Sequence, residues 1–241
     1  MRNQSRRGSR TRSAAPPRPT PAPIGVLTAY DGRMLLLSDP LVGAIPIEDC
    51  EEGLIDITDV PELALDLRKP EPAGSRLRAC VVERLQLAQR RLPAGTALLI
   101  IEGHRPAEQQ RALFESHRSS LAASNTTWSD SRLDSEASKY VSPPSVAPHP
   151  CGAAVDLTLT RNGLEIDMGT PVNATPEQSD NACFTKATTI SAPAAAARRL
   201  LGEVLSAEGF INYPSEWWHW SFGDRYWAAV TGAPHAIYGP R

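Results

Sequence analysis

The segment HPCGAAVDLTL, residues 149–159, combines a strand pattern with two groups that bind metal ions. Its second half, Ala153–Leu159, is an apolar run typical of a β-strand, interrupted by the carboxylate of Asp156. A buried carboxylate needs a partner or a metal ion, because an isolated charge is costly to remove from water. His149 precedes the strand, and the small residues from Gly152 onward would let the backbone pass close to a metal. The segment predicts a strand with one metal ligand and a preceding loop with another.

A second segment, SEWWHW at residues 215–220, supplies a further imidazole, that of His219. His149, Asp156 and His219 together form a three-ligand set for catalytic zinc, which keeps its fourth position for water. Glu216 lies three residues before His219 and can act on that water without binding the metal, as a general base and acid. A histidine in an aromatic run is more often a packed residue, and each motif alone is a weak signal. The combination predicts one zinc ion per chain.

Arg105 lies in the segment GHRP, residues 103–106, between a predicted strand and a predicted helix. A loop in this position can present a side chain to a site. A fixed guanidinium there would lower the barrier of a reaction that develops negative charge beside it. The alternative is a surface arginine paired with a carboxylate. The neighbouring His104 is a candidate for orienting substrate, and a plain structural role is the alternative.

The remaining patterns predict an α+β fold, with a small antiparallel sheet that carries the metal ligands and helices packed on one side. The predicted helices cover residues 74–92, 106–117 and 193–209, and the predicted strands cover residues 34–37, 54–57, 96–102, 153–159 and 217–222. Residues 118–148 are rich in Ser, Asn, Asp and Pro and are predicted to form a long loop or lid. Trp217, Trp218 and Trp220 are expected in the core and the pocket wall. Residues 24–241 would then form a single domain.

Charge and composition exclude several classes of protein. The chain has 241 residues with a net charge of −2, and its first 24 residues hold six Arg and no acid. The rest holds 19 basic and 27 acidic residues, which argues against a general nucleic-acid binder. No apolar run approaches the roughly 18 residues of a membrane helix, so we expect no membrane partner. Residues 1–23 are predicted to be a disordered basic tail without the apolar region of a secretion signal, which predicts a cytoplasmic protein.

The four cysteines lie far apart, with no C-x-x-C pair. Their spacing predicts free thiols, and a single disulfide is the alternative. Cys151 falls inside the first metal motif. A fourth protein ligand would close the position that catalysis needs, so we interpret Cys151 as a small packed residue. His117 and His235 match no pattern and are expected at the surface.

With these motifs, the sequence resembles the zinc D-alanyl-D-alanine dipeptidases of the vancomycin-resistance type and the related D,D-peptidases. The resemblance covers roughly residues 40–228 and is most specific around the Glu-Trp-Trp-His block, residues 216–219. It implies that His149, Asp156 and His219 bind zinc and that Glu216 is the general base and acid. It also implies that Arg105 steadies the oxyanion, and that the substrate is a small peptide ending in D-Ala-D-Ala.

The sequence departs from the family pattern at two places. Members carry Phe-Asp shortly after the Met-Gly-Thr segment, and that Asp holds the substrate's ammonium group. Here the match is Val172-Asn173, and a neutral Asn cannot offer the charge-assisted bond that an ammonium prefers. Asp167, Glu165 or the acids of residues 118–148 are the candidates to compensate. The Ser that relatives often carry just before the first ligand is also absent, since residues 147 and 148 are Ala and Pro.

These features leave three functions to compare. A dipeptidase acting on free D-alanyl-D-alanine is the leading prediction, with Asn173, Asp167 and His104 as candidate substrate-binding residues. A D,D-carboxypeptidase that trims longer cell-wall peptides is the first alternative, since such a substrate has no free amine near position 173. A non-catalytic module that binds zinc or cell-wall peptide is the second, and it would be expected to lack Glu216 or Arg105.

Overall fold

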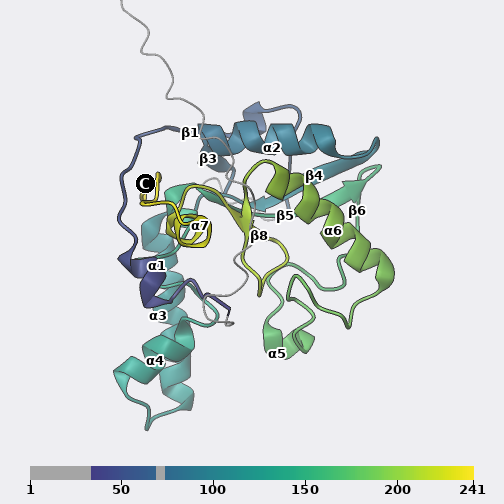
Figure 1. Ribbon diagram of the computed structural model, residues 1–241. Coiled ribbons are helices and arrows are strands. Elements are labelled where there is room, and N and C mark those ends of the chain that lie inside the picture. The colour runs from purple at the N-terminus through teal and green to yellow at the C-terminus, as the bar shows by residue number, and fades with distance from the viewer. Residues whose placement is uncertain (1–33, 69–73) are drawn as a thin grey trace, which may run out of the picture.

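The computed structural model describes residues 34–68 and 74–241 (Figure 1), so the predicted tail, residues 1–23, lies outside the described part. The α-helices are α1 Pro40–Ala44, α2 Ala79–Arg91, α3 Ala107–Ser124, α4 Asp130–Ala137, α5 Pro176–Ser179, α6 Ala192–Ala207 and α7 Arg225–Thr231. The strands are β1 Leu54–Asp56, β2 Ala64–Leu65, β3 Arg76–Arg78, β4 Thr96–Glu102, β5 Ala154–Arg161, β6 Leu164–Glu165, β7 Ile211–Asn212 and β8 His219–Ser221. Two short 3-10 helices are η1 Ile57–Asp59 and η2 His149–Cys151. The predicted α+β class is confirmed.

The main sheet has the strand order β2-β4-β5-β8-β7, and β6 also pairs with β5. The central pairs, β4 with β5 and β5 with β8, are antiparallel, as predicted. The edge strand β2 is parallel to β4, because the chain passes through β3 and helix α2 between them. A separate two-stranded ribbon, β1 with β3, leads into α2.

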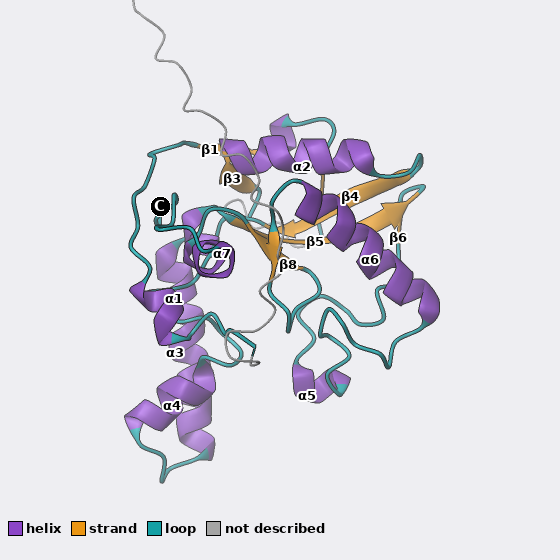
Figure 2. Ribbon diagram, viewed as in Figure 1, coloured by secondary structure: helices purple, strands orange, loops and turns teal. Residues whose placement is uncertain are grey.

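The two faces of β5 differ because side chains alternate along a strand. Val155, Leu157 and Leu159 are fully buried and belong to the same apolar core as residues of α2 and α6. These two helices lie together over the sheet in Figure 2. Asp156 and Thr158 alternate with the apolar residues and are buried on the opposite face. The sheet therefore has one face for the core and one face for polar chemistry.

The predicted loop at residues 118–148 is wrong over much of its length. Helix α3 continues to Ser124, and α4 occupies Asp130–Ala137, beginning at an N-cap where Ser129 accepts from the backbone of Arg132. The two helices pack on each other and extend from the body of the protein (Figure 1). In α4 the buried residues are Leu133 and Ala137. A helix with so small a buried stripe has the polar composition of a loop, which explains the error.

Three further boundaries differ from the prediction. Residues 34–37 form irregular chain rather than a strand. Within the predicted helix at 74–92, residues 76–78 form β3 instead, because their backbone pairs with β1, and α2 begins at Ala79. The predicted strand at 217–222 shortens to His219–Ser221. No helix in the described ranges combines the length and apolarity needed to cross a membrane.

Candidate metal centre and active site

The predicted metal ligands converge at the centre of the polar face. Strand register places Asp156 of β5 directly opposite His219 of β8, so both side chains lie on one face. The Oδ1 atom of Asp156 is 2.9 Å from Nδ1 of His219 and 3.5 Å from Nε2 of His149. One candidate ligand atom from each residue lies within 4.8 Å of the others, and all three residues are buried. This is the donor set and burial that a tetrahedral metal site requires.

The orientation of His149 selects its metal-binding atom. Its Nδ1 is 2.7 Å from the carbonyl oxygen of Gly103, so Nδ1–H donates there and Nε2 keeps its lone pair toward Asp156. Metal-bound histidines commonly donate their other N–H to a carbonyl or carboxylate in this way. The bond also ties the ligand to the loop that carries Arg105. The residues present therefore fit a divalent cation.

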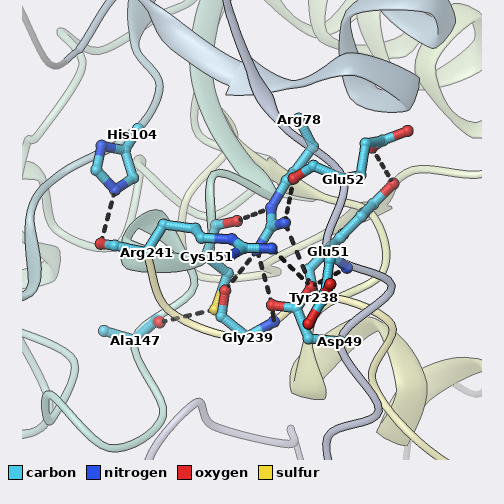
Figure 3. Close-up of polar contacts among 10 residues, drawn as sticks. All are labelled: Asp49, Glu51, Glu52, Arg78, His104, Ala147, Cys151, Tyr238, Gly239 and Arg241. Atoms are coloured by element: carbon cyan, nitrogen blue, oxygen red, sulfur yellow. Dashed lines mark hydrogen bonds and ion pairs between the residues drawn. The ribbon is translucent and has the colours of Figure 1, made fainter.

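A buried arginine supports the turn that presents His149 (Figure 3). Arg78 is fully buried, and its Nε donates to the carbonyl oxygen of Cys151 at 2.8 Å. Its Nη2 donates to Asp49 at 3.0 Å and to the carbonyl oxygen of Gly239 at 2.7 Å. The η2 turn is thus held from behind by segments far away in sequence.

Gly152 ends this turn in a conformation that favours glycine. Its φ is 64°, and a Cβ there would lie 2.4 Å from Cδ2 of Leu54. The requirement for glycine therefore comes from backbone geometry and packing against Leu54, whereas the sequence interpretation attributed it to the metal. The Cys151 side chain is buried, and burial raises the pKa of its thiol to about 12. Cys151 is not among the converging ligand atoms, which agrees with a packed residue.

The histidines keep Asp156 ionised despite its burial. Burial alone would raise its pKa, but the charges and hydrogen bonds of His149 and His219 hold it well below the usual range. Burial alone would lower the pKa of His219, but the bond to Asp156 and the charge of that carboxylate raise it. An ionised carboxylate between two imidazoles attracts a cation, so the electrostatics agree with the donor geometry.

Glu216 stands beside the three ligands. Its Oε2 lies 3.9 Å from Nδ1 of His219, and its side chain keeps 31% exposure while those of the ligands keep about 5%. The close packing around it raises the pKa of its carboxyl group. A carboxylate next to a metal centre, with a raised pKa and access to solvent, is suited to proton transfer. The structure thus places Glu216 where the sequence predicted a general base.

Arg105 is held beside this centre by two residues that the sequence interpretation missed. Its Nε and Nη2 donate to the two carboxylate oxygens of Glu102 at 2.6 and 2.8 Å, and Nη1 donates to Oε1 of Gln110 at 2.6 Å. An irregularity in β4 after Ile100 shifts the register by one residue, so that Glu102 lies opposite Asp156. Such a bulge changes the direction of a side chain, and here it turns Glu102 toward the polar face.

The predicted substrate-binding residues have different positions. A pocket of about 170 Å³ lies beside Arg105, and its lining residues are Leu65, Gly74, Ile101, Glu102, Arg105, Gln109, Leu113 and Asn173. Asn173 thus shares a pocket with Arg105. Asp167 is exposed, accepts a bond from the backbone of Gly169 and is not part of this lining. His104 is buried with its Nε2 3.3 Å from the main-chain oxygen of Arg241, which favours the structural alternative.

Other conspicuous side chains are mainly structural. Trp217, Trp218 and Trp220 are buried in the core, as predicted. All four cysteines are free thiols. His117 was expected at the surface; it is half-buried, and its ring lies 5.2 Å from that of Tyr140.

Comparison with known proteins gives the class. The family model described as D-Ala-D-Ala dipeptidase, Peptidase_M15, matches residues 78–233, and the chain belongs to this family of metallopeptidases. A D-alanyl-D-alanine dipeptidase of Synechocystis sp. is 26% identical over 225 residues, covering 77% of this chain and 87% of that protein. One of Enterococcus faecium is 30% identical over 135 residues, covering 54% of this chain and 64% of that protein.

Among solved structures, similarity is weaker. The LdcB LD-carboxypeptidase is 16% identical with a TM-score of 0.46, covering 78% of this chain and 76% of that chain. A mutant of the vancomycin-resistance D,D-pentapeptidase VanY, in complex with Zn(II), is 18% identical with a TM-score of 0.39, covering 70% of this chain and 84% of that chain.

Proposed function

We propose that this protein is a zinc-dependent dipeptidase that hydrolyses free D-alanyl-D-alanine. The observation that carries the proposal is the convergence of His149, Asp156 and His219, with Glu216 beside them and Arg105 held at the neighbouring pocket. The named relatives of Synechocystis and Enterococcus support the choice of substrate. One such cluster is found in the described part of the chain, which supports one zinc ion per chain. The cytoplasmic location stays a prediction.

Each residue has a defined part in the proposed reaction. Zinc bound by His149, Asp156 and His219 would activate a water molecule by lowering its pKa and would polarise the scissile carbonyl. Glu216 accepts a proton from the attacking water and passes it to the amine of the departing D-alanine. The Arg105 guanidinium donates toward the carbonyl oxygen as negative charge develops on it. Its fork is fixed in advance by Glu102 and Gln110, so little reorganisation is needed during the reaction.

A D,D-carboxypeptidase acting on longer peptides is the second candidate. The observation in its favour is Asn173, which lines the pocket and carries no charge to pair with a free ammonium group. The pocket lining does contain one carboxylate, Glu102, but both of its oxygens already accept from Arg105. A substrate with a blocked amine has no ammonium group to pair, so the absence of a free carboxylate in this pocket would not weaken its binding.

One assay separates these functions. The purified full chain loaded with zinc is given D-Ala-D-Ala and N-acetyl-D-Ala-D-Ala in parallel, with the Glu216→Gln variant as control. We expect faster hydrolysis of the free dipeptide, loss of activity with a chelator, and no activity in the variant despite bound zinc. Preference for the acetylated peptide would replace the dipeptidase with the carboxypeptidase. No hydrolysis of either peptide by a zinc-loaded protein would indicate a binding module.

A further inference from the structure

The outer end of the pocket beside Arg105 is reached along one face of helix α3. Gln109 and Leu113 line the pocket and lie four residues apart, so they share this face. The next position on the same face is His117, whose ring packs against that of Tyr140 at 5.2 Å. Tyr140 follows α4, the helix that folds back on α3. The α3 wall of the pocket therefore continues outward into the pair His117 and Tyr140.

A second segment of the pocket lining leads to the partner of Tyr140. Asn173 lines the pocket, and four residues later Glu177 lies in α5. The Tyr140 hydroxyl donates to Oε1 of Glu177 at 2.6 Å. The same two parts of the chain that form the pocket walls are thus joined beyond the pocket by one side-chain hydrogen bond. We name this contact the Tyr140–Glu177 bridge.

Each end of the bridge is anchored to the active site. On the Tyr140 side, Gln110 donates to the carbonyl oxygen of Ser142 at 2.7 Å while its Oε1 accepts from Arg105. The chain two residues after Tyr140 is thus bonded to a residue that also holds Arg105.

On the Glu177 side, a capping box between Thr175 and Gln178 fixes α5. The hydroxyl of Ser179, also in α5, accepts from the backbone of Cys183 at 3.2 Å. The carbonyl of Cys183 accepts in turn from the backbone of Trp217 at 3.1 Å, next to Glu216. The bridge therefore spans the two sides that hold the catalytic residues.

The hydrogen bond between Tyr140 and Glu177 is stable in solvent but can break and re-form. Glu177 is exposed and its pKa is lowered by the tyrosine, so it accepts as a carboxylate. The carboxylate raises the pKa of Tyr140 to about 12, which keeps the hydroxyl protonated as a donor. A single charge-assisted hydrogen bond at an exposed position restrains two walls without locking them.

We infer that the Tyr140–Glu177 bridge limits the length of the peptide that the active site accepts. The rise of an α-helix places His117 about 6 Å beyond Leu113 along α3. An extended peptide covers about 3.3–3.6 Å per residue, so roughly two residues beyond the pocket meet the bridge. A dipeptide stays inside it, whereas a tetrapeptide must displace it. This inference rests on the proposed function, because it needs a peptide bound at the metal centre.

The test compares di-, tri- and tetrapeptides of D-alanine as substrates for the zinc-loaded full chain. Tyr140→Phe removes only the hydroxyl, and Glu177→Ala removes the acceptor from the other wall. We expect either variant to raise kcat/KM for the tetrapeptide three- to tenfold relative to the dipeptide, with the dipeptide value within twofold of wild type. The double variant should gain no more than either single one, because both remove the same bond. Asp134→Asn is the matched control, since it breaks an ion pair with Arg118 between α4 and α3 without touching Tyr140 or Glu177.

The outcomes distinguish the bridge from the proposed function. A wild-type enzyme that prefers the dipeptide, with variants that relax this preference, supports the bridge. Unchanged tetrapeptide-to-dipeptide ratios in both single variants overturn it, as does an equal shift in Asp134→Asn. A wild type that cleaves all three peptides equally overturns the bridge and leaves the hydrolytic function intact. A wild type that retains zinc and cleaves none of them refutes the proposed function, and the bridge falls with it.

Discussion

Replacing Glu102 with glutamine tests whether Arg105 acts through a fixed orientation. Glu102→Gln keeps the shape of the side chain but removes its charge and leaves one acceptor oxygen where Arg105 now has two. The guanidinium keeps its bond to Gln110, so it is loosened rather than released. We expect a lower kcat with near-normal zinc content, because the contact with the oxyanion is strongest in the transition state.

The size of the effect follows from the contacts. A hydrogen bond to a charged group contributes about 1.5–3 kcal/mol, and the lower part of this range applies because the two side chains keep 17% and 27% exposure. A loss of about 1.5–2 kcal/mol corresponds to a roughly 10- to 30-fold decrease in kcat. Steady-state kinetics with D-Ala-D-Ala, together with metal analysis of each preparation, measures both quantities.

A matched control separates orientation from general destabilisation. Glu208→Gln weakens a similar pair, in which Arg91 donates to Glu208 at 2.6 Å between α2 and the end of α6. This pair joins residues outside the metal cluster and the pocket lining, so kcat should stay within about twofold of wild type. A Glu102→Gln enzyme with unchanged kcat would refute the orienting role of Glu102. Loss of zinc together with activity would show instead that Glu102 supports the metal.

Three further predictions concern single side chains. Glu216→Ala should retain zinc while kcat falls by about 10²–10⁴-fold, and metal analysis beside kinetics would expose a ligand role if zinc were lost. Asn173→Asp should lower KM for D-Ala-D-Ala by up to about tenfold and leave KM for N-acetyl-D-Ala-D-Ala unchanged. Equal KM values for D-Ala-D-Ala in the wild type and the variant would show that the ammonium group binds elsewhere. Because burial raises the pKa of Cys151 to about 12, its thiol stays neutral at pH 8, and mass spectrometry after brief alkylation should find it unmodified beside a labelled, exposed Cys50.

The grouping of the candidate metal ligands could be predicted from the sequence because its signals are local. Asp156 interrupts an apolar strand, and Glu216 precedes His219 by three residues. A carboxylate in such a strand has few stable surroundings other than a cation, so residue type and periodicity together predict its environment. In the structure, the antiparallel register of β5 and β8 places Asp156 opposite His219.

The support of Arg105 could not be predicted in the same way. Glu102 would face the core if β4 continued without interruption, since it would follow Leu98 and Ile100, which are fully buried there. The bulge that turns it depends on pairing with β5, a contact between residues distant in sequence. The weak signal was a glutamate at the end of an apolar strand, three residues before Arg105.

The errors at residues 118–148 have a different physical origin. Helices α3 and α4 pack mainly on each other, and Arg118 pairs with Asp130 and Asp134 across them. Their stability therefore comes from the Ser129 cap of α4 and from side-chain pairs on a polar surface, which leave little hydrophobic periodicity to detect. Because α3 and α4 have this polar composition, they can extend into solvent, where Tyr140 contacts Glu177.

The three candidate metal ligands are held in position by two different means, and this difference explains why Arg78 is buried behind one of them. Asp156 and His219 lie on paired strands, where ladder hydrogen bonds set their separation. His149 lies on a one-turn 3-10 helix, which alone would leave its position poorly defined. Beside the bond from His149 to the Gly103 carbonyl, Arg78 restrains this turn, because its side chain donates to the Cys151 carbonyl and its backbone donates to the Gly152 carbonyl at 2.9 Å. A metal site tolerates positional errors of only about 0.5 Å in its ligands. No strand holds His149, so the buried Arg78, bonded to three carbonyls and one carboxylate, positions the turn that carries it.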